Sequence, residues 1–466
     1  MMNKESGLNS TEYTRAIQEQ DNLFLHPWES MSELGNNKRT IVTQAEGVYV
    51  FDSDGNKLLD APAGMWCVNV GYGRQEIAEA MAKQAVEMPY FSPFHMGAEP
   101  ASRLAKKLGE LAPGDLNHVF FTTCGSTAVD SALRFLSFYN NFLGRTEKKH
   151  IISRDGAYHG STYLSASVSG KSRDKEFMDM EQQLIHFLSS PNPTNRPDGM
   201  SVAQFCDAAV KELEDKILEL GPDKVAGFVA EPILASGGVI IPPQGYHKAC
   251  LEVCRRYDVL YISDEVVTAF GRLGHMFASE EVFDIVPDIL TCAKGLTSGY
   301  VPLGALLISD RLLEDLRGEE EKKASFSSGF TYSGHPVSCA AALENIDIIE
   351  REEMLLHARE VAPYFLEQLS TLEDLPLVAE VRGIGLMAGV VCAIPGKESL
   401  ALDTEIGTRV DKHCQRLGLL VRPIYHMCVM SPPIIITRSE IDEMVRILRQ
   451  GIELATEDLK VEGIWD

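Results

Sequence analysis

A regular alternation of short apolar runs and amphipathic stretches, from about residue 75 to residue 337, constrains the fold most. Residues 225–230 form an apolar run of strand length, and residues 211–220 before it have helical periodicity. Strands that alternate with helices along a chain predict a mainly parallel sheet with helices on both faces. With 466 residues, the chain is also long enough for two lobes.

Lys294 stands at the end of residues 288–293, an apolar run that is typical of a buried strand. A lysine in a buried position is costly unless it is paired or neutral. Desolvation lowers the pKa of such an amine, which then becomes a nucleophile that can form a Schiff base. The alternative is a lysine that only ends the strand and extends its ammonium to water.

Asp264 ends a second apolar run, residues 259–263. A carboxylate at the carboxyl end of a buried parallel strand lies where open α/β sheets bind ligands. A Schiff-base lysine together with an acid that faces a pyridinium nitrogen is typical of pyridoxal phosphate (PLP) chemistry. Adjacent strand residues point to opposite faces, so Asp264 and Glu265 are not expected to share a metal site or a glycosidase site.

A candidate phosphate site lies at Gly125, Ser126 and Thr127, between a strand-like run (residues 119–124) and an amphipathic stretch (residues 128–139). Such a turn offers backbone N–H groups, hydroxyl groups and the positive end of a helix dipole. By itself the pattern is equally typical of an ordinary helix N-cap.

Together with four further motifs, these sequences resemble the class III aminotransferases, which are PLP enzymes of fold type I. The chain is most similar to the ω-amine:pyruvate branch, and the similarity extends from about residue 34 to residue 448. Each motif alone is weak, but seven in the same order are specific. The motifs lie at residues 66–73, 125–128, 158–162, 231–233, 264–266, 294–295 and 330–336.

The resemblance implies an α/β fold with a mainly parallel, seven-stranded sheet in a large PLP-binding domain, residues 76–337. Residues 1–75 and residues 338–466 are expected to form a smaller α+β domain over the cofactor. Within the C-terminal part, residues 381–391 have the pattern of a strand, and residues 439–454 have the pattern of a helix.

The catalytic residues implied by the resemblance are Lys294, Asp264 and Tyr158. Lys294 is expected to bind PLP and to move a proton from the substrate carbon to the cofactor. Asp264 is expected to pair with the pyridinium nitrogen. Tyr158 is expected to stack on one face of the ring, while Val266 packs on the other.

Further cofactor contacts are implied in the same way. His159 is expected to be a supporting hydrogen-bonding residue, with a satisfied core histidine as the alternative. Glu231 is expected to brace Asp264 or the hydroxyl side of the ring. The 125–127 turn is expected to bind the phosphate, and Thr331 to reach the phosphate of the neighbouring subunit. A homodimer, or a tetramer built from it, is therefore the expected working unit, with active sites at the subunit interface.

Substrate selection is expected to depend on four positions. Relatives that use 2-oxoglutarate often carry a gate glutamate where this chain has Ser236, which favours pyruvate as the acceptor. Trp66 and Phe94 are expected to line the donor pocket, with core packing as the alternative for both. Arg422 matches the arginine that meets substrate carboxylates, because a guanidinium binds a carboxylate through two hydrogen bonds. Pro423 stiffens the backbone that follows it.

The formal net charge of −24 argues against nucleic acid and anionic membranes as partners. No apolar run is long enough to span a bilayer, and no leader segment is recognisable. The ten cysteines have no metal-like spacing, and Cys250 and Cys254 are expected to pack within a helix. No metal is expected, and a cytoplasmic location is expected.

The predicted function is that of a PLP-dependent aminotransferase with a ping-pong mechanism and a pyridoxamine intermediate. It would move an amino group from a primary amine, a diamine or an ω-amino acid to pyruvate. The open alternatives on the same scaffold are a 2-oxoglutarate-dependent ω-amino acid aminotransferase, an aminomutase and a racemase. A non-catalytic PLP-fold protein would be expected to lack Lys294 or Asp264, and a nucleotide-binding protein to carry a Walker or Rossmann glycine pattern, which is absent.

Overall fold

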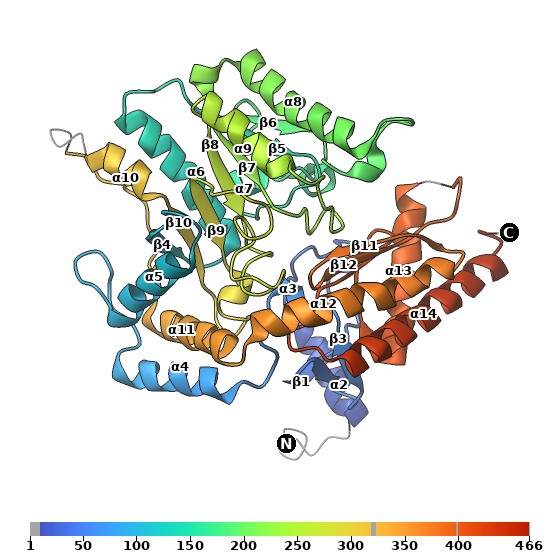
Figure 1. Cartoon of the computed structure of the whole chain (residues 1–466). Coiled ribbons are helices and arrows are strands. Elements are labelled where there is room, and N and C mark those ends of the chain that lie inside the picture. The colour runs from blue at the N-terminus through green and yellow to red at the C-terminus, as the bar shows by residue number, and fades with distance from the viewer. Residues whose placement is uncertain (1–9, 318–322, 398, 466) are drawn as a thin grey trace.

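The computed structural model describes residues 10–317, 323–397 and 399–465 (Figure 1). Three sheets organise these residues: one of seven strands and two of four strands each. No helix in the described ranges is both long and apolar enough to cross a membrane.

The seven-stranded sheet is the framework of the larger lobe. Its strands run in the order β4-β10-β9-β8-β7-β5-β6. The pairs among β5, β6, β7, β8 and β9 are parallel, whereas β10 is antiparallel to both of its neighbours. The expected mainly parallel, seven-stranded sheet is therefore confirmed. The strands are β4 (His118–Thr122), β5 (His150–Arg154), β6 (Ile185–Leu188), β7 (Val225–Ala230), β8 (Leu260–Asp264), β9 (Ile289–Cys292) and β10 (Gly304–Ile308).

Helices cover both faces of this sheet, because side chains that alternate along each strand need apolar partners on either side. On β8, Leu260 and Ile262 pack with α6 (Gly125–Phe142), whereas Tyr261 packs with α8 (Val202–Leu220) and α9 (Tyr246–Arg256). At one edge of the lobe, α11 packs against α4 and α5 (Figure 1). These three helices are α4 (Gln75–Glu87), α5 (Glu99–Leu111) and α11 (Pro336–Arg351).

The smaller lobe combines the two ends of the chain, at the right of Figure 1. One of its sheets has the order β1-β2-β3-β13, and β13 (Leu419–Leu420) pairs in parallel with β3 (Lys57–Asp60). The other sheet has the order β11-β12-β15-β14. The remaining strands and helices of the smaller lobe are β1 (Val42–Glu46), β2 (Tyr49–Asp52), β11 (Val378–Ile384), β12 (Met387–Cys392), β14 (Arg422–Ile424), β15 (Met427–Met430), α12 (Met354–Ser370), α13 (Leu400–Leu417) and α14 (Arg438–Val461).

Residues 381–391 were expected to form one strand, and this expectation is wrong. They belong to an antiparallel hairpin of β11 and β12 that turns at Gly385, where φ is +58°. Glycine adopts such a left-handed conformation without a steric penalty. The predicted C-terminal helix is present as α14, and Cys250 and Cys254 are buried in α9 as expected.

The pairing of β3 with β13 supports the proposed division of the chain into two lobes. The proposed boundary between residues 337 and 338 falls inside α11, which packs on helices of the large lobe. Shorter elements complete the fold: α2 (Ser10–Asp21), α3 (Ala63–Trp66), α7 (Tyr163–Ser167), α10 (Asp310–Arg317), and 3-10 turns at Ser172–Lys175, Pro193–Asn195, Pro222–Lys224, Lys294–Leu296 and Thr371–Asp374.

Candidate active site

Lys294 and Asp264 lie at the carboxyl ends of neighbouring parallel strands. Asp264 is the last residue of β8 and pairs in register with Thr291 of β9, three residues before Lys294. Lys294 has φ +40°, a left-handed conformation that costs a non-glycine residue about 1–3 kcal/mol and tends to occur at functional sites. The sheet topology therefore brings together the two residues whose positions were most informative in the sequence.

The Lys294 amine has no hydrogen bond or ion pair with any described residue, and its nitrogen lies 6.0 Å from the centroid of the Trp66 ring. Burial lowers the pKa of Lys294, and the attraction of Asp264 opposes this shift. Because a lowered pKa leaves more of the amine neutral near pH 7, the side chain is suited to nucleophilic attack on an aldehyde.

Asp264 is held on both of its carboxylate oxygens. Its Oδ2 lies 2.6 Å from His159 Nδ1, while Oδ1 accepts hydrogen bonds from Thr291 Oγ1 at 3.1 Å and from the Val266 backbone at 3.2 Å. The residue is only 4 % exposed. His159 thus lies where a supporting hydrogen-bonding residue was expected, and Thr291 is a partner that the sequence analysis missed.

Glu231 braces Tyr158 rather than Asp264. Its Oε1 accepts a hydrogen bond from the Tyr158 backbone at 2.9 Å, and its Oε2 accepts one from the Ala235 backbone at 3.1 Å. Burial raises the pKa of Glu231, and repulsion by Asp264 adds to the shift. Of the two expected roles, bracing Asp264 is not seen among the described contacts, since two carboxylates side by side would repel each other, and bracing the hydroxyl side of the ring stays a prediction.

Tyr158 is positioned through both its backbone and its hydroxyl, which lies 3.0 Å from Ser161 Oγ. Burial raises the pKa of Tyr158, so its phenol stays protonated at neutral pH. The ring has Trp28 at 6.0 Å between centroids and the Lys171 ammonium at 5.7 Å. Neither neighbour was expected from the sequence, since both lie outside the motifs.

The N-terminus of α6 has unoccupied donors where a phosphate was expected. The backbone N–H groups of Gly125 and Ser126 have no acceptor in the described structure. The absence of a side chain at Gly160 allows the segment around Gly160 to lie against this turn, since a Cβ there would lie 2.6 Å from Ser126 Cα. The Ser161 backbone donates to Ser126 Oγ at 3.1 Å, which joins the two motifs.

The Thr127 hydroxyl is less available to a phosphate than that of Ser126. Its hydroxyl donates to the Cys124 carbonyl at 2.9 Å and accepts from the Cys124 backbone at 3.0 Å, so it caps α6. Val266 lies against Gly125, where a Cβ would come within 2.8 Å of the valine side chain. The close packing explains why glycine is needed at position 125, and it brings Val266 to the mouth of the phosphate turn.

The residues predicted to select the substrate are Trp66, Arg422 and Ser236. Trp66 is 3 % exposed and has φ +57°, and the Arg422 guanidinium carbon lies 4.9 Å from the centroid of its ring. Lys294 and Arg422 therefore both lie near the Trp66 ring. Both Trp66 Nε1 and Arg422 Nε are buried without a hydrogen-bond partner. Ser236 is buried in the loop after β7.

Phe94 and Thr331 do not join this site within one subunit. Phe94 is 67 % exposed, and Thr331 is exposed in the turn before α11. Their segments lie together, because a Cβ on Gly329 would be 4.0 Å from the Phe94 ring and because the rings of Tyr90 and Tyr332 are 6.0 Å apart. The roles predicted for Phe94 and Thr331 therefore stay predictions.

Glu265 points away from Asp264, as expected for adjacent residues at a strand end. Its carboxylate accepts hydrogen bonds from the backbone N–H groups of Ala278 and Ser279 at 2.7 and 2.8 Å. The described residues contain no group of three or more His, Cys, Asp or Glu side chains that could hold a metal ion.

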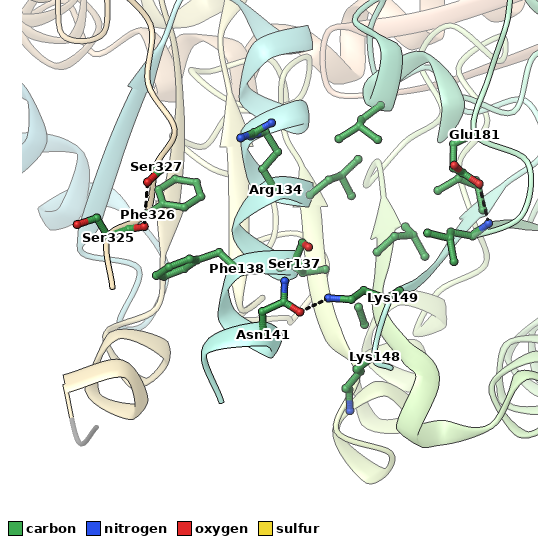
Figure 2. A pocket seen from close by; sticks show the side chains of 17 residues that line it. Arg134, Ser137, Phe138, Asn141, Lys148, Lys149, Glu181, Ser325, Phe326 and Ser327 are labelled. Atoms are coloured by element: carbon green, nitrogen blue, oxygen red, sulfur yellow. Dashed lines mark hydrogen bonds between the residues drawn. The ribbon is translucent and has the colours of Figure 1, made fainter. Parts of the chain in front are cut away.

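A separate pocket of about 490 Å³ lies beside the middle of α6 (Figure 2). Arg134 and Phe138 of α6, Lys149 and Phe326 are among its lining residues, and Asn141 and Lys149 point toward one another. None of the predicted site residues lines it. The pocket is thus distinct from the site around Lys294.

The residues around Lys294 fit PLP in three respects. An unpaired, partly buried amine can take the aldehyde, the buried Asp264 carboxylate can face the ring nitrogen, and the free N–H groups of Gly125 and Ser126 can take the phosphate. Each of these groups was present in the sequence, but their convergence depends on the order of the strands.

Comparisons with known proteins agree with this geometry. The family model for class III aminotransferases matches residues 31–452. A putrescine–pyruvate aminotransferase of Pseudomonas aeruginosa is 41 % identical over 432 residues, which cover 92 % of this chain and 94 % of the relative. A diaminobutyrate–2-oxoglutarate transaminase of Halomonas elongata is 37 % identical over 92 % of this chain and 93 % of its own.

Solved structures show the same fold. The ω-transaminase of Pseudomonas jessenii in complex with PMP has a TM-score of 0.91 and 35 % sequence identity, covering 95 % of this chain and 98 % of its own. Class III aminotransferases use PLP, which is the cofactor that the Lys294 site fits. The chain therefore belongs to the class III aminotransferases and is a PLP-dependent transaminase.

Proposed function

We propose that this transaminase moves an amino group from a primary amine, a diamine or an ω-amino acid to pyruvate. The observation that carries the reaction type is the unpaired, partly buried Lys294 amine near the Asp264–His159 pair. Pyruvate as acceptor is supported by Ser236, which leaves no gate carboxylate at that position, and by the pyruvate-dependent relative from Pseudomonas aeruginosa.

Bound PLP supplies an aldehyde for amine exchange and a ring that accepts electrons from the substrate carbon. The Lys294 amine would hold the cofactor and, when free, would act as the general base that takes a proton from the substrate carbon. The Asp264 carboxylate would hold a proton on the ring nitrogen, and His159 fixes the orientation of that carboxylate through Nδ1.

The remaining residues orient the reactants. Tyr158 and Val266 would hold the ring from its two faces, and Glu231 fixes the Tyr158 backbone. Gly125 and Ser126 would bind the phosphate through their N–H groups, with a smaller role for Thr127, whose hydroxyl is used in the α6 cap. Arg422 would bind the carboxylate of pyruvate through its free Nε and one terminal nitrogen.

We also propose a homodimer as the smallest working unit, in a cytoplasmic setting. Several large apolar side chains are exposed around Phe94 and the turn that carries Thr331, and exposed apolar patches of this kind mark interfaces. The exposed side chains of this surface are Tyr90, Phe91, Phe94, Met96 and Tyr332. All ten cysteines are free, which fits a reducing compartment.

A 2-oxoglutarate-dependent reaction is the second candidate, because a relative from Halomonas elongata carries that acceptor in its name. A carboxylate longer than pyruvate would have to fit between Arg422 and the loop around Ser236. An aminomutase or racemase would leave no keto product in solution, so product analysis separates these reactions from a transaminase.

Absorbance spectra of the PLP-loaded enzyme during single half-reactions test the proposal. The donors are putrescine, β-alanine, taurine, 1-phenylethylamine, ornithine, γ-aminobutyrate and L-alanine. We expect at least one donor to bleach the visible band and pyruvate to restore it faster than 2-oxoglutarate does. Faster recovery with 2-oxoglutarate would refute the argument from Ser236, and a band that no donor bleaches would refute the proposed donor range.

A further inference from the structure

Two cations outside the family motifs lie beside the substrate side of the site. Lys171 follows α7, and its ammonium lies 5.7 Å from the centroid of the Tyr158 ring. Arg173 belongs to the 3-10 turn Ser172–Lys175, and its guanidinium carbon lies 4.8 Å from the centroid of the Tyr425 ring. Tyr425 directly follows β14, the strand that begins at Arg422, so Arg173 lies beside the end of that strand, whereas Lys171 lies beside Tyr158.

The three cations Lys171, Arg173 and Arg422 are close enough to affect one another. Arg173 and Arg422 both repel the Lys171 ammonium, and Arg173 also repels Arg422. Like charges are unfavourable when they are held together, and the arrangement becomes favourable when an anion lies between them. We call these three side chains the cationic rim.

The anions beside the rim do not neutralise it. Arg173 pairs through Nε with Asp174 at 3.2 Å, which leaves its terminal nitrogens without a described partner. Lys171 has no carboxylate within 4.0 Å among the described residues, although Asp174 and Glu231 attract it from farther away. Three cations therefore face two carboxylates, and one of these, Glu231, is already held by two backbone N–H groups.

Arg422 also indicates that the cationic rim binds an anion, because its Nε is buried without a partner. A buried donor that lacks an acceptor is unfavourable, and an anionic ligand would supply the missing acceptor. The Lys294 amine and the Arg422 guanidinium both lie near the Trp66 ring, so the far end of a donor whose amine is at Lys294 can reach Arg422.

We propose that Lys171 and Arg173, together with Arg422, select amine donors whose far end is an anion, such as an ω-amino carboxylate or an amino sulfonate, over diamines. The inference rests on the proposed aminotransferase function and narrows its donor class. A diamine would place its second ammonium next to the rim and be repelled, whereas a carboxylate or sulfonate of the same length would be attracted.

Three donors of similar length test this selectivity on the PLP-loaded enzyme: γ-aminobutyrate, n-butylamine and putrescine. Their far ends are anionic, neutral and cationic, so the series varies charge with little change in size. We expect the apparent second-order rate constant of the half-reaction to fall in that order, by about tenfold or more from γ-aminobutyrate to putrescine. High salt should reduce this ratio because it screens the charges.

The variant Lys171→Gln/Arg173→Gln keeps Arg422 and removes the two new cations. We expect the ratio of the rate constants for γ-aminobutyrate and putrescine to fall by about fivefold or more, because the anionic donor should react more slowly and the cationic donor faster. Lys211→Gln is the matched control, because Lys211 lies on the outer helix α8 and pairs there with Asp215. Its ratio should equal that of the unaltered enzyme.

Butyrate gives a readout that does not depend on turnover, because it has the anionic end without the amine. Calorimetry on the holoenzyme should show that the double variant binds butyrate about fivefold more weakly, while Lys211→Gln binds it normally. Equal butyrate affinity in the double variant, or a faster reaction with putrescine than with γ-aminobutyrate, would overturn the inference. In the second case the aminotransferase function would stand. If no donor reacted but butyrate binding still depended on the rim, the function would fail and the anion site would remain.

Discussion

The two walls of the Lys294 site differ in which of their polar groups have hydrogen-bond partners. On the cofactor wall, both oxygens of Asp264 and both oxygens of Glu231 accept hydrogen bonds. On the substrate wall, Trp66 Nε1 and Arg422 Nε are buried without partners. The carboxylates of the cofactor wall are thus fully paired, although His159 Nε2 and the N–H groups of Gly125 and Ser126 are open there. On the substrate wall the open groups are the donors that face the substrate.

This difference has a functional meaning. A cofactor stays in place through every turnover, so its contacts can be held rigidly by the protein. Two successive substrates, an amine and a keto acid, must share the other wall, and open donors there can bind each in turn. Buried donors without partners are costly in a folded protein, which suggests that substrates complete them.

Replacing Lys294, at the centre of the cofactor wall, should have the largest effect on activity. Lys294→Ala should lower kcat/KM for every donor by about 10⁴-fold or more, because both the covalent link and the general base are lost. Borohydride reduction followed by peptide mass spectrometry should locate the cofactor on Lys294 in the unaltered enzyme and find no adduct in the variant. An adduct on another lysine would contradict the assignment.

Replacing the acid of the same wall should have the next largest effect. Asp264→Asn keeps the shape but removes the charge that would hold the ring nitrogen protonated, so we expect kcat to fall by about 10²–10³-fold. The weaker bond to His159 should also lower the free energy of unfolding by about 1–3 kcal/mol. The matched control is Glu265→Gln, which alters the neighbouring buried carboxylate. It should affect stability but leave the visible spectrum of the bound cofactor unchanged; a spectral change in this control alone would contradict the comparison.

The substrate wall should respond selectively. Arg422→Gln should lower kcat/KM for pyruvate by about 10–100-fold, because a charge-assisted hydrogen-bonded pair is lost. The half-reaction with 1-phenylethylamine, which has no carboxylate, should change by less than about threefold. Arg416→Gln, on α13, serves as the control for loss of an exposed arginine. An equal loss for both substrates would show that Arg422 shapes the site rather than binding the carboxylate.

The smallest expected effect comes from pH. Burial lowers the pKa of Lys171 to about 8, with Glu231 and Asp174 opposing this shift and Arg173 and Arg422 adding to it. Lys171 is therefore charged below pH 8 and neutral above it, so the preference for γ-aminobutyrate over n-butylamine should fall a few-fold between pH 7 and pH 9.5. Lys171→Gln should remove this dependence. A ratio that declines equally in the variant would assign the titration to another group.

The sequence predicted the cofactor wall better than the substrate wall, for a physical reason. Lys294 and Asp264 end apolar runs, and the carboxyl ends of parallel strands meet at one edge of a sheet, so the apolar pattern and the family motifs together predicted that they share a site. Lys171 and Arg173 lie in an irregular segment and reach the site only through packing against Tyr158 and Tyr425. No periodic pattern encodes such contacts.

Two other differences have local causes. The β11–β12 hairpin was missed because apolar residues continue through its turn, although Gly385 was a usable turn signal. The roles of Phe94 and Thr331 could not be tested within one subunit, where both residues are exposed. The proposed division between the lobes also fell inside α11, since a continuous helical period hides the change of neighbours.

The parallel pairing of Leu59 with Leu419 has a consequence for biosynthesis. During translation, β3 emerges early and must wait for almost the whole remaining chain before its partner β13 leaves the ribosome. The seven strands of the large lobe are all complete by residue 308, so that lobe can become compact first. Until release, β3 keeps an open edge that can pair with other nascent chains. Chains that end before residue 419 should therefore aggregate rather than accumulate as partly folded, soluble enzyme.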